Sequence, residues 1–281
     1  MQEIDNADNF VPQSAPPSTH QSAPQSPVQT PSPQPRGIPI PISRPYATYA
    51  LLAAIVIVYV GQMVIDQTSE TGTNALVEFG VLWPYGVYHG DFYRLLTNLF
   101  LHGGIAHLAF NCYALWIFGK LVEGFFGHAR FLLIYFVAGL FGSIAELLIL
   151  QAALGASGAI FGIFGAQMVF LYQNRQVFGT RATQELRSLV FLALLNLGFG
   201  VFSQIAPGAV KIGLGAHVGG FVAGAALAWL IAPRYALATD SLTPRVVDLV
   251  PQRQVWIAAA LSAVAVIIGY IASMIVMQKA F

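Results

Sequence analysis

The chain has 281 residues, of which 56% are hydrophobic and only 9% are charged, and its formal net charge is +1 at pH 7. A soluble domain carries about 25% charged residues, so this composition cannot cover a water-facing surface and predicts an integral membrane protein. No basic stripe is present, so nucleic acid is not an expected partner. Cys112 is the only cysteine, which excludes an intramolecular disulfide and a cysteine-based metal cluster.

The first 43 residues are rich in Pro, Gln and Ser. Such a segment buries too little apolar surface to offset the entropy lost on ordering, so residues 1–43 are predicted to form a disordered tail. The tail is acidic and polar rather than basic and then apolar, so we expect no cleavable signal peptide.

Seven apolar segments follow, each close to the roughly 20 residues that cross the hydrocarbon core of a bilayer. A longer and more polar connection, residues 66–98, separates the first two. The predicted spans are 46–65, 103–122, 129–150, 157–173, 186–206, 216–232 and 255–277. The sequence therefore predicts an all-α, polytopic membrane helical bundle with about seven transmembrane helices.

The basic residues predict how this bundle is oriented. Ten of the 13 Lys and Arg residues fall on the side of the membrane that holds the N-terminus. Because cytoplasmic loops carry the excess of Lys and Arg, we expect a cytoplasmic N-terminus and an outer C-terminus. The second, fourth and sixth spans then begin at the outer face. Their first turns hold His107, Ser157 and His217 at a similar depth.

Ser157 lies in the segment Leu-Gly-Ala-Ser-Gly-Ala-Ile-Phe-Gly, residues 154–162. Residues without a Cβ let either a substrate backbone or a neighbouring helix approach closely. Taken alone, the segment is therefore compatible with a nucleophilic serine and with a small-residue helix interface.

His217 opens a span in which His217, Gly220 and Gly224 share one helix face. A matching face on the fourth span consists of Gly158, Gly162 and Gly165. If the two faces pack in the small-residue manner of membrane helices, Ser157 and His217 meet at the outer end of the contact. That juxtaposition favours a catalytic pair over an isolated packing histidine.

His107 and Asn111 lie four residues apart and point the same way from the second span. Both side chains can donate hydrogen bonds, which acyl transfer needs to stabilise a developing oxyanion. An interhelical hydrogen bond explains the pair equally well. His102 is five residues from His107, about 140° round a helix, so the two histidines do not form a simple metal pair and no metal is expected.

With these three motifs in this order, residues 46–232 resemble the rhomboid family of intramembrane serine proteases. The resemblance implies that Ser157 is the nucleophile and His217 its general base, without an acidic third member. It also implies an oxyanion hole formed by the Ser157 backbone N–H, His107 and Asn111. Neither a cofactor nor a metal is implied.

The sequence departs from the family at two supporting positions. Tyr93-Arg94 stands where a Trp-Arg pair is common, with the arginine expected to stabilise the first loop. Phe161 stands where many members carry Tyr, so its ring can pack on His217 without a hydroxyl group. The supporting residues that the resemblance implies are Gly155, Gly158, Phe161, Gly220, Gly224 and Arg94.

The resemblance also divides the chain and names its partners. It implies a cytoplasmic tail (1–43), a six-helix catalytic core (44–233), a cytoplasmic connection (234–254) and an additional C-terminal transmembrane helix (255–277). The implied substrates are transmembrane segments of membrane proteins. The N-terminus has no basic, transit-like segment and the core is compact, which favours a bacterial plasma membrane. The distribution of Lys and Arg places the active site towards the outer face.

Three other functions are compatible with parts of the pattern. A catalytically inactive relative that binds membrane clients typically lacks the serine or the histidine, and this chain keeps both. A transporter could use His107, His217 and Glu146 as a proton path, but no inverted repeat is evident. A Ser-His dyad could also cleave a lipid ester.

Overall fold

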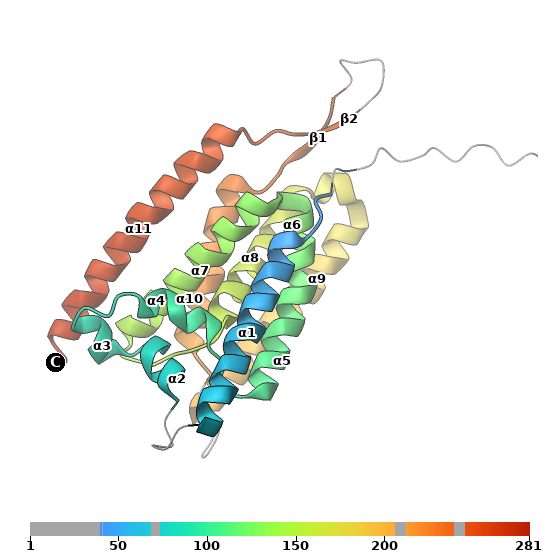
Figure 1. Ribbon diagram of the computed structural model, residues 1–281. Coiled ribbons are helices and arrows are strands. Elements are labelled where there is room, and N and C mark those ends of the chain that lie inside the picture. Colours follow the sequence, from blue (N-terminus) through green and yellow to red (C-terminus); the bar gives the residue numbers. More distant parts are fainter. Residues whose placement is uncertain (1–39, 41, 69–73, 206–211, 239–244) are drawn as a thin grey trace, which may run out of the picture. The chain divides into compact units, whose positions relative to one another are not determined.

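The computed structural model describes residues 40, 42–68, 74–205, 212–238 and 245–281, and the predicted tail lies almost wholly outside them. These residues form a polytopic helical bundle, which confirms the predicted fold class (Figure 1). The elements are α1 (Tyr46–Thr68), α2 (Ala75–Gly80), α3 (Pro84–Tyr88), α4 (Arg94–Thr97), η1 (Asn98–Phe100), α5 (Ile105–Ala114), η2 (Leu115–Gly119), α6 (Lys120–Phe126), α7 (His128–Leu148), α8 (Ser157–Gln173), α9 (Arg175–Ile205), α10 (Leu214–Ile231), β1 (Tyr235–Ala238), β2 (Arg245–Asp248) and α11 (Gln252–Gln278).

Within the described residues, six helical segments are long and apolar enough to cross a membrane. One of them, Ile105–Phe126, joins α5 and α6 through the π-helical segment η2. The helix α8 is apolar but has only 17 residues. Together they account for the seven predicted spans, and the protein is an integral, multi-pass membrane protein.

The short helix α8 lies at the centre of the bundle and packs most extensively against α10 and α7. Eleven of its 17 residues are buried. A helix that is apolar on every side can face either lipid or other helices. The burial of α8 shows that the helix that begins at Ser157 is largely covered by other helices.

The glycine faces of α8 and α10 meet, as the sequence predicts. A Cβ atom at Gly220 would overlap the carbonyl oxygen of Gly158, and one at Gly224 would overlap the carbonyl oxygen of Gly162. The two backbones are thus in direct contact over two turns of each helix. Such an approach is open only to residues without side chains.

The helix α1 is held at its start by a buried carboxylate. The Glu123 carboxylate accepts hydrogen bonds from the backbone N–H groups of Ala47 and Thr48 at 2.8 and 2.7 Å, and from the Thr48 hydroxyl at 2.6 Å. These groups are free at a helix start, so Glu123 caps α1.

Two regions predicted as plain connections have structure of their own. The connection 66–98 contains α2, α3 and α4, and we call residues 74–104 the first loop. The connection 234–254 contains an antiparallel hairpin of β1 and β2. Arg130 donates a hydrogen bond to Asp248 at 2.6 Å and ties this hairpin to α7.

The fifth predicted span also begins earlier than expected. The helix α9 starts at Arg175 and is interrupted at Gly179, where φ is 59° and ψ is −140°. A residue with a Cβ rarely adopts that conformation. Arg181, which lies between the predicted spans 157–173 and 186–206, is therefore part of the helix itself.

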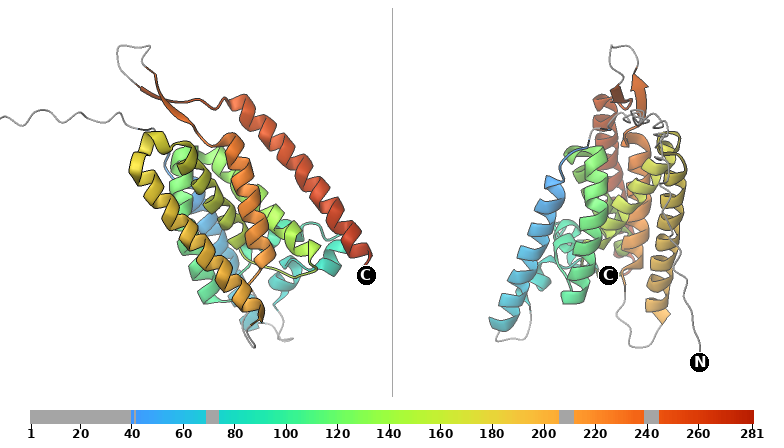
Figure 2. Two further views of the ribbon diagram at one scale, coloured as in Figure 1. Left: turned by 180° about the vertical axis from the view of Figure 1, so that it is seen from behind. Right: turned by 90° about the vertical axis from the view of Figure 1, so that its right-hand side faces the viewer.

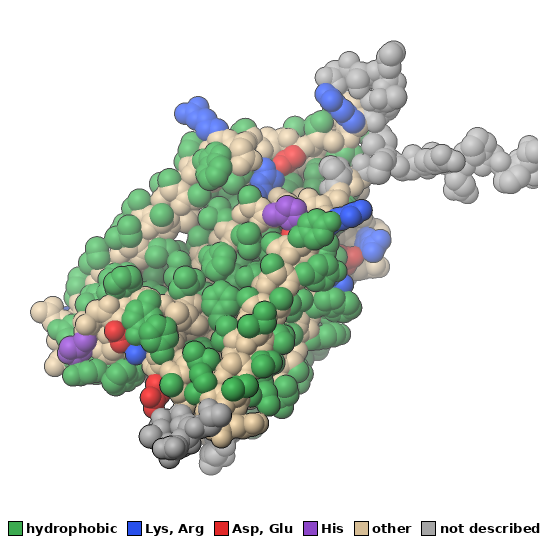
Figure 3. Space-filling view, in the orientation of Figure 1, with side chains coloured by type: hydrophobic (Ala, Val, Ile, Leu, Met, Phe, Trp, Pro, Cys, Tyr) green, Lys and Arg blue, Asp and Glu red, His purple; other side chains and the backbone are tan. Residues whose placement is uncertain are grey.

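The two ends of the bundle differ in charge. Figure 3 shows most of the Lys and Arg side chains of the visible face near the end at which α1 and α11 begin. The first loop and the starts of α5, α8 and α10 lie at the opposite end (Figure 1). There, the end of α11 lies beside α3 (Figure 2), and Phe281 makes an edge-to-face contact with Tyr85.

Replacing Gly224 by Ala should destabilise the bundle by about 1–3 kcal/mol, because the added methyl overlaps the Gly162 carbonyl and forces α8 and α10 apart. The measurement is the free energy of unfolding in detergent micelles. The matched control is Gly198→Ala on α9, where a Cβ meets nothing within 4 Å. Equal losses in the two variants would contradict a special role for the glycine contact.

Candidate active site

Ser157 is the first residue of α8 and is half-buried. The chain reaches it through Gly155, whose φ of 123° is a left-handed conformation suited to glycine, and through Ala156 as the N-cap. The first N–H groups of a helix lack intrahelical partners, and the helix dipole gives this end a partial positive charge. The Ser157 backbone N–H is therefore a free donor beside the serine hydroxyl.

The segment that leads into α8 is bound to the first loop. Ala153 and Leu82 exchange backbone hydrogen bonds of 3.0 and 3.1 Å, and the Gly155 N–H donates to the Asn98 carbonyl at 2.9 Å. The Asn98 side chain in turn donates to the Ser143 hydroxyl on α7 at 3.0 Å. These contacts fix the place at which α8 begins.

His107 lies in the first turn of α5, and its ring faces Gly155. A Cβ atom at Gly155 would lie 2.8 Å from both Nε2 and Cε1 of His107. The Gly103 N–H donates to Nδ1 of His107 at 3.4 Å. Since Nδ1 acts as an acceptor, the neutral imidazole carries its proton on Nε2. The structure thus assigns a donor to the ring nitrogen that faces the Ser157 segment.

Asn111 is buried one turn further along α5 and keeps its amide within its own helix. Its Nδ2 donates to the His107 carbonyl at 2.9 Å. The amide has two N–H bonds, and this contact uses one of them. The contact therefore ties Asn111 to the residue with which it was predicted to act.

His217 lies in the first turn of α10, and its ring stacks on Phe161 of α8 with centroids 4.1 Å apart and planes inclined by 15°. The Ala216 carbonyl lies 3.2 Å from where a Cβ of Gly158 would stand. The residues next to Ser157 and His217 are therefore in backbone contact. Within the described residues, no hydrogen bond joins the Ser157 hydroxyl to the His217 imidazole.

Arg94 holds the first loop together. Its side chain is 7% exposed, and it donates to the carbonyls of Glu78 and Val81 at 2.6 and 3.1 Å. It also forms an ion pair with Asp91 at 2.8 Å. The neighbouring Tyr93 ring stacks on Phe79. The buried guanidinium thus links α4 to the end of α2 through two backbone carbonyls.

His102 was not among the predicted site residues, yet it lies against one of them. It is 1% exposed, and its ring makes an edge-to-face contact with His107 at 5.1 Å. Burial and the neighbouring His107 lower the pKa of His102 to about 4, so the ring is neutral at pH 7. Gln62 of α1 holds the His102 backbone through two hydrogen bonds. Its spacing of five residues from His107 gave no sequence signal for this contact, because His102 precedes the helix on which His107 lies.

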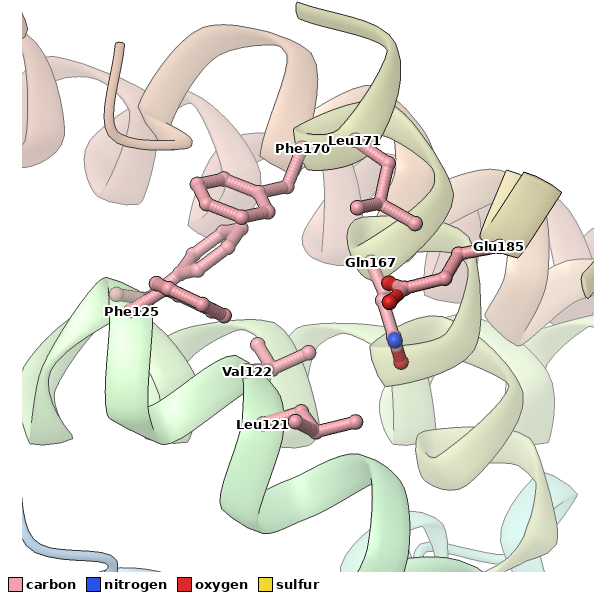
Figure 4. Close-up of a pocket in the computed structure, with 8 residues that line it drawn as sticks. Leu121, Val122, Phe125, Gln167, Phe170, Leu171 and Glu185 are labelled. Atoms are coloured by element: carbon pink, nitrogen blue, oxygen red, sulfur yellow. The ribbon is translucent and has the colours of Figure 1, made fainter. Parts of the chain in front are cut away.

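A small apolar cavity lies between α6, α8 and α9, away from these residues (Figure 4). Gln167 and Glu185 point into it from α8 and α9, opposite Phe125 and Val122. It contains none of the predicted site residues. Within the described residues, no cluster of three His, Cys, Asp or Glu side chains is placed to hold a metal ion.

Comparisons with known proteins agree on one family. The rhomboid domain family matches residues 89–234. The chain is 39% identical over 186 residues to the rhomboid protease GluP of Bacillus subtilis (strain 168), covering 66% of this chain and 35% of that protein. Two Arabidopsis thaliana proteins, RHOMBOID-like protein 6, mitochondrial, and RHOMBOID-like protein 2, are 33% and 34% identical over 57% and 58% of this chain. The chain spans 50% of each of these two.

Replacing Arg94 by Ala should loosen the first loop and lower the free energy of unfolding by about 1–3 kcal/mol, because the carbonyls of Glu78 and Val81 lose a charged donor and the ion pair with Asp91 is lost. The measurements are thermal unfolding and hydrogen exchange of a peptide covering residues 75–82, which should exchange faster. The control is Arg181→Ala, which removes an exposed ion pair with Glu185. Unchanged hydrogen exchange in the Arg94 variant would contradict the role of Arg94 in holding the first loop.

Proposed function

Because the chain belongs to the rhomboid family, we propose that it is an intramembrane serine protease that cleaves transmembrane segments of other membrane proteins. The observation that carries this proposal is the backbone contact of α8 and α10, which lies one residue from Ser157 and one residue from His217. The name of GluP as a rhomboid protease supports the same reaction class.

In the proposed reaction the Ser157 hydroxyl attacks a peptide carbonyl while His217 accepts the serine proton. His217 then gives that proton to the leaving amine, and water releases the acyl group from Ser157 in the reverse sequence. Hydrogen bonds between a nucleophile and its base are often long in free enzymes and shorten when substrate binds. The stacked Phe161 ring limits how far the His217 imidazole can turn.

The oxyanion of the tetrahedral intermediate would lie beside the start of α8. The Ser157 backbone N–H and Nε2–H of His107, whose ring faces Gly155, would be two of its donors. The second N–H bond of the Asn111 amide supplies a third donor. Fixed donors of this kind favour the charge that appears only in the transition state.

The length of α8 supports a site below the membrane surface. Seventeen residues make a helix of about 26 Å, shorter than the roughly 30 Å hydrocarbon core. The Lys and Arg side chains of the visible face gather at the far end of the bundle (Figure 3), which supports a cytoplasmic location for that end. The active site would then face the outer side, where it could meet membrane-embedded substrates.

A fluorophosphonate probe should label Ser157, and the labelling should require His217. Wild-type protein in detergent should react, whereas Ser157→Ala and His217→Ala should not, because one lacks the nucleophile and the other its base. Labelling is measured by in-gel fluorescence and located by peptide mass spectrometry. The control is Ser188→Ala, which removes an exposed serine on α9 and should label as wild type. Labelling that survives in folded Ser157→Ala protein would refute the assignment.

Replacing His107 or Asn111 by Ala should lower kcat by about 100-fold or more, because each removes an oxyanion donor. KM should change little, because the ground-state carbonyl gains less from these donors than the oxyanion does. Cleavage of a reconstituted transmembrane substrate measures both constants. The control is Phe110→Ala, whose side chain is 75% exposed on the same helix. An effect confined to KM would exclude the oxyanion role.

A further inference from the structure

Glu146 is a buried carboxylate that the proposed mechanism does not use. It lies near the end of α7 and is 2% exposed. Within the described residues no Lys or Arg forms an ion pair with it. An unpaired carboxylate is costly to bury, so its surroundings must compensate for the lost water.

The hydrogen bonds that the buried carboxylate of Glu146 would otherwise make to water are replaced by a contact with the start of α10. Oε1 of Glu146 accepts a hydrogen bond from the Ala216 N–H at 2.7 Å. Ala216 belongs to the first turn of α10, where N–H groups lack intrahelical partners. A negative charge at this end is also favoured by the helix dipole. Glu146 therefore caps α10.

The sequence makes room for this carboxylate. A Cβ at Gly213 would lie 2.9 Å from Oε1 of Glu146, and one at Gly215 would lie 3.1 Å from its Cδ. The carboxylate also lines a cavity of about 150 Å³, together with Gln151 and Gln204. A cavity of this size with polar side chains in its wall admits water, which can solvate the carboxylate beside the start of α10.

The capped turn is the turn that carries His217. Ala216, whose N–H Glu146 holds, directly precedes His217 and has its carbonyl beside Gly158 of α8. The His217 N–H donates to the carbonyl of Gly213 at 3.1 Å. Phe161 sets the orientation of the His217 ring, but the position of its backbone depends on how this first turn is held.

We propose that Glu146 is a positioning residue for the general base: it holds the first turn of α10 so that the His217 imidazole faces Ser157. The inference rests on the proposed function, because it assigns His217 the role of base. Glu146 touches neither substrate nor the reacting atoms. It acts through the Ala216 N–H group, to which its carboxylate oxygen is bound.

The variants Glu146→Ala and Glu146→Gln separate this role from others. Loss of the cap should lower kcat of Glu146→Ala by about 10- to 100-fold, the effect of a misplaced catalytic group, with KM little changed. Glu146→Gln keeps an acceptor oxygen for Ala216 and should recover most of kcat. A proton-relay role predicts instead that Gln is as inactive as Ala, and that result would overturn the proposal.

Glu123→Ala is the matched control for stability. Glu123 is also a buried carboxylate that caps a helix start, but it holds α1 at the opposite end of the bundle. Both Ala variants should unfold at lower temperature. At a temperature where both remain folded, only Glu146→Ala should show the lower kcat. An equal loss of kcat in the two variants would show that Glu146 acts only through the stability of the fold, and would overturn its positioning role.

Hydrogen exchange tests the cap without any reaction. A peptide covering residues 213–219 should exchange faster in Glu146→Ala than in wild type, and the Glu123 variant should leave it unchanged. If wild-type protein fails to react at Ser157, the proposed function fails while this measurement still tests the cap. Unchanged exchange in Glu146→Ala would overturn the positioning role even if the protein is an active protease.

Discussion

Direct backbone contact between α8 and α10 governs how close Ser157 and His217 can come. Within a bilayer, lipid chains are as apolar as leucine, so helices associate through close packing rather than through burial from water. The carbonyls of Gly158 and Gly162 occupy the space that a side chain at Gly220 or Gly224 would take. The distance between the two helices is thus set by glycine residues, which have no side chain. No bond between the serine and the histidine is needed to hold them in the same layer.

Polar contacts fix the helix ends that this packing brings together. His107 lies on Gly155, Glu146 caps α10, and Arg94 holds the first loop on which the start of α8 depends. Glu146 and Arg94 bind backbone groups directly, through the Ala216 N–H and through the carbonyls of Glu78 and Val81. The two buried carboxylates, Glu123 and Glu146, cap helices at opposite ends of the bundle. A buried carboxylate that caps a helix therefore stabilises the fold at one end of the bundle and the candidate active site at the other.

The features predictable from sequence were those with a local period. The lengths of the apolar segments predicted the membrane spans. Spacings of three and four residues predicted the glycine faces of two helices and the shared face of His107 and Asn111. The hairpin of β1 and β2 was missed, since its strands have four residues each and depend on the distant Arg130. His102 was missed for the same reason: its place beside His107 is fixed by Gln62, 40 residues earlier. The left-handed Gly155 became meaningful only once Asn98 and His107 were seen beside it.

The most direct test of the account is a crystal structure of the protein after reaction with a fluorophosphonate, because the phosphonyl group mimics the tetrahedral intermediate. The account predicts phosphorus bonded to Oγ of Ser157, with the His217 imidazole within hydrogen-bond distance of that oxygen. The phosphonyl oxygen should accept hydrogen bonds from the Ser157 N–H and from Nε2 of His107. A phosphonyl oxygen turned away from both donors, or an adduct on another residue, would contradict the account.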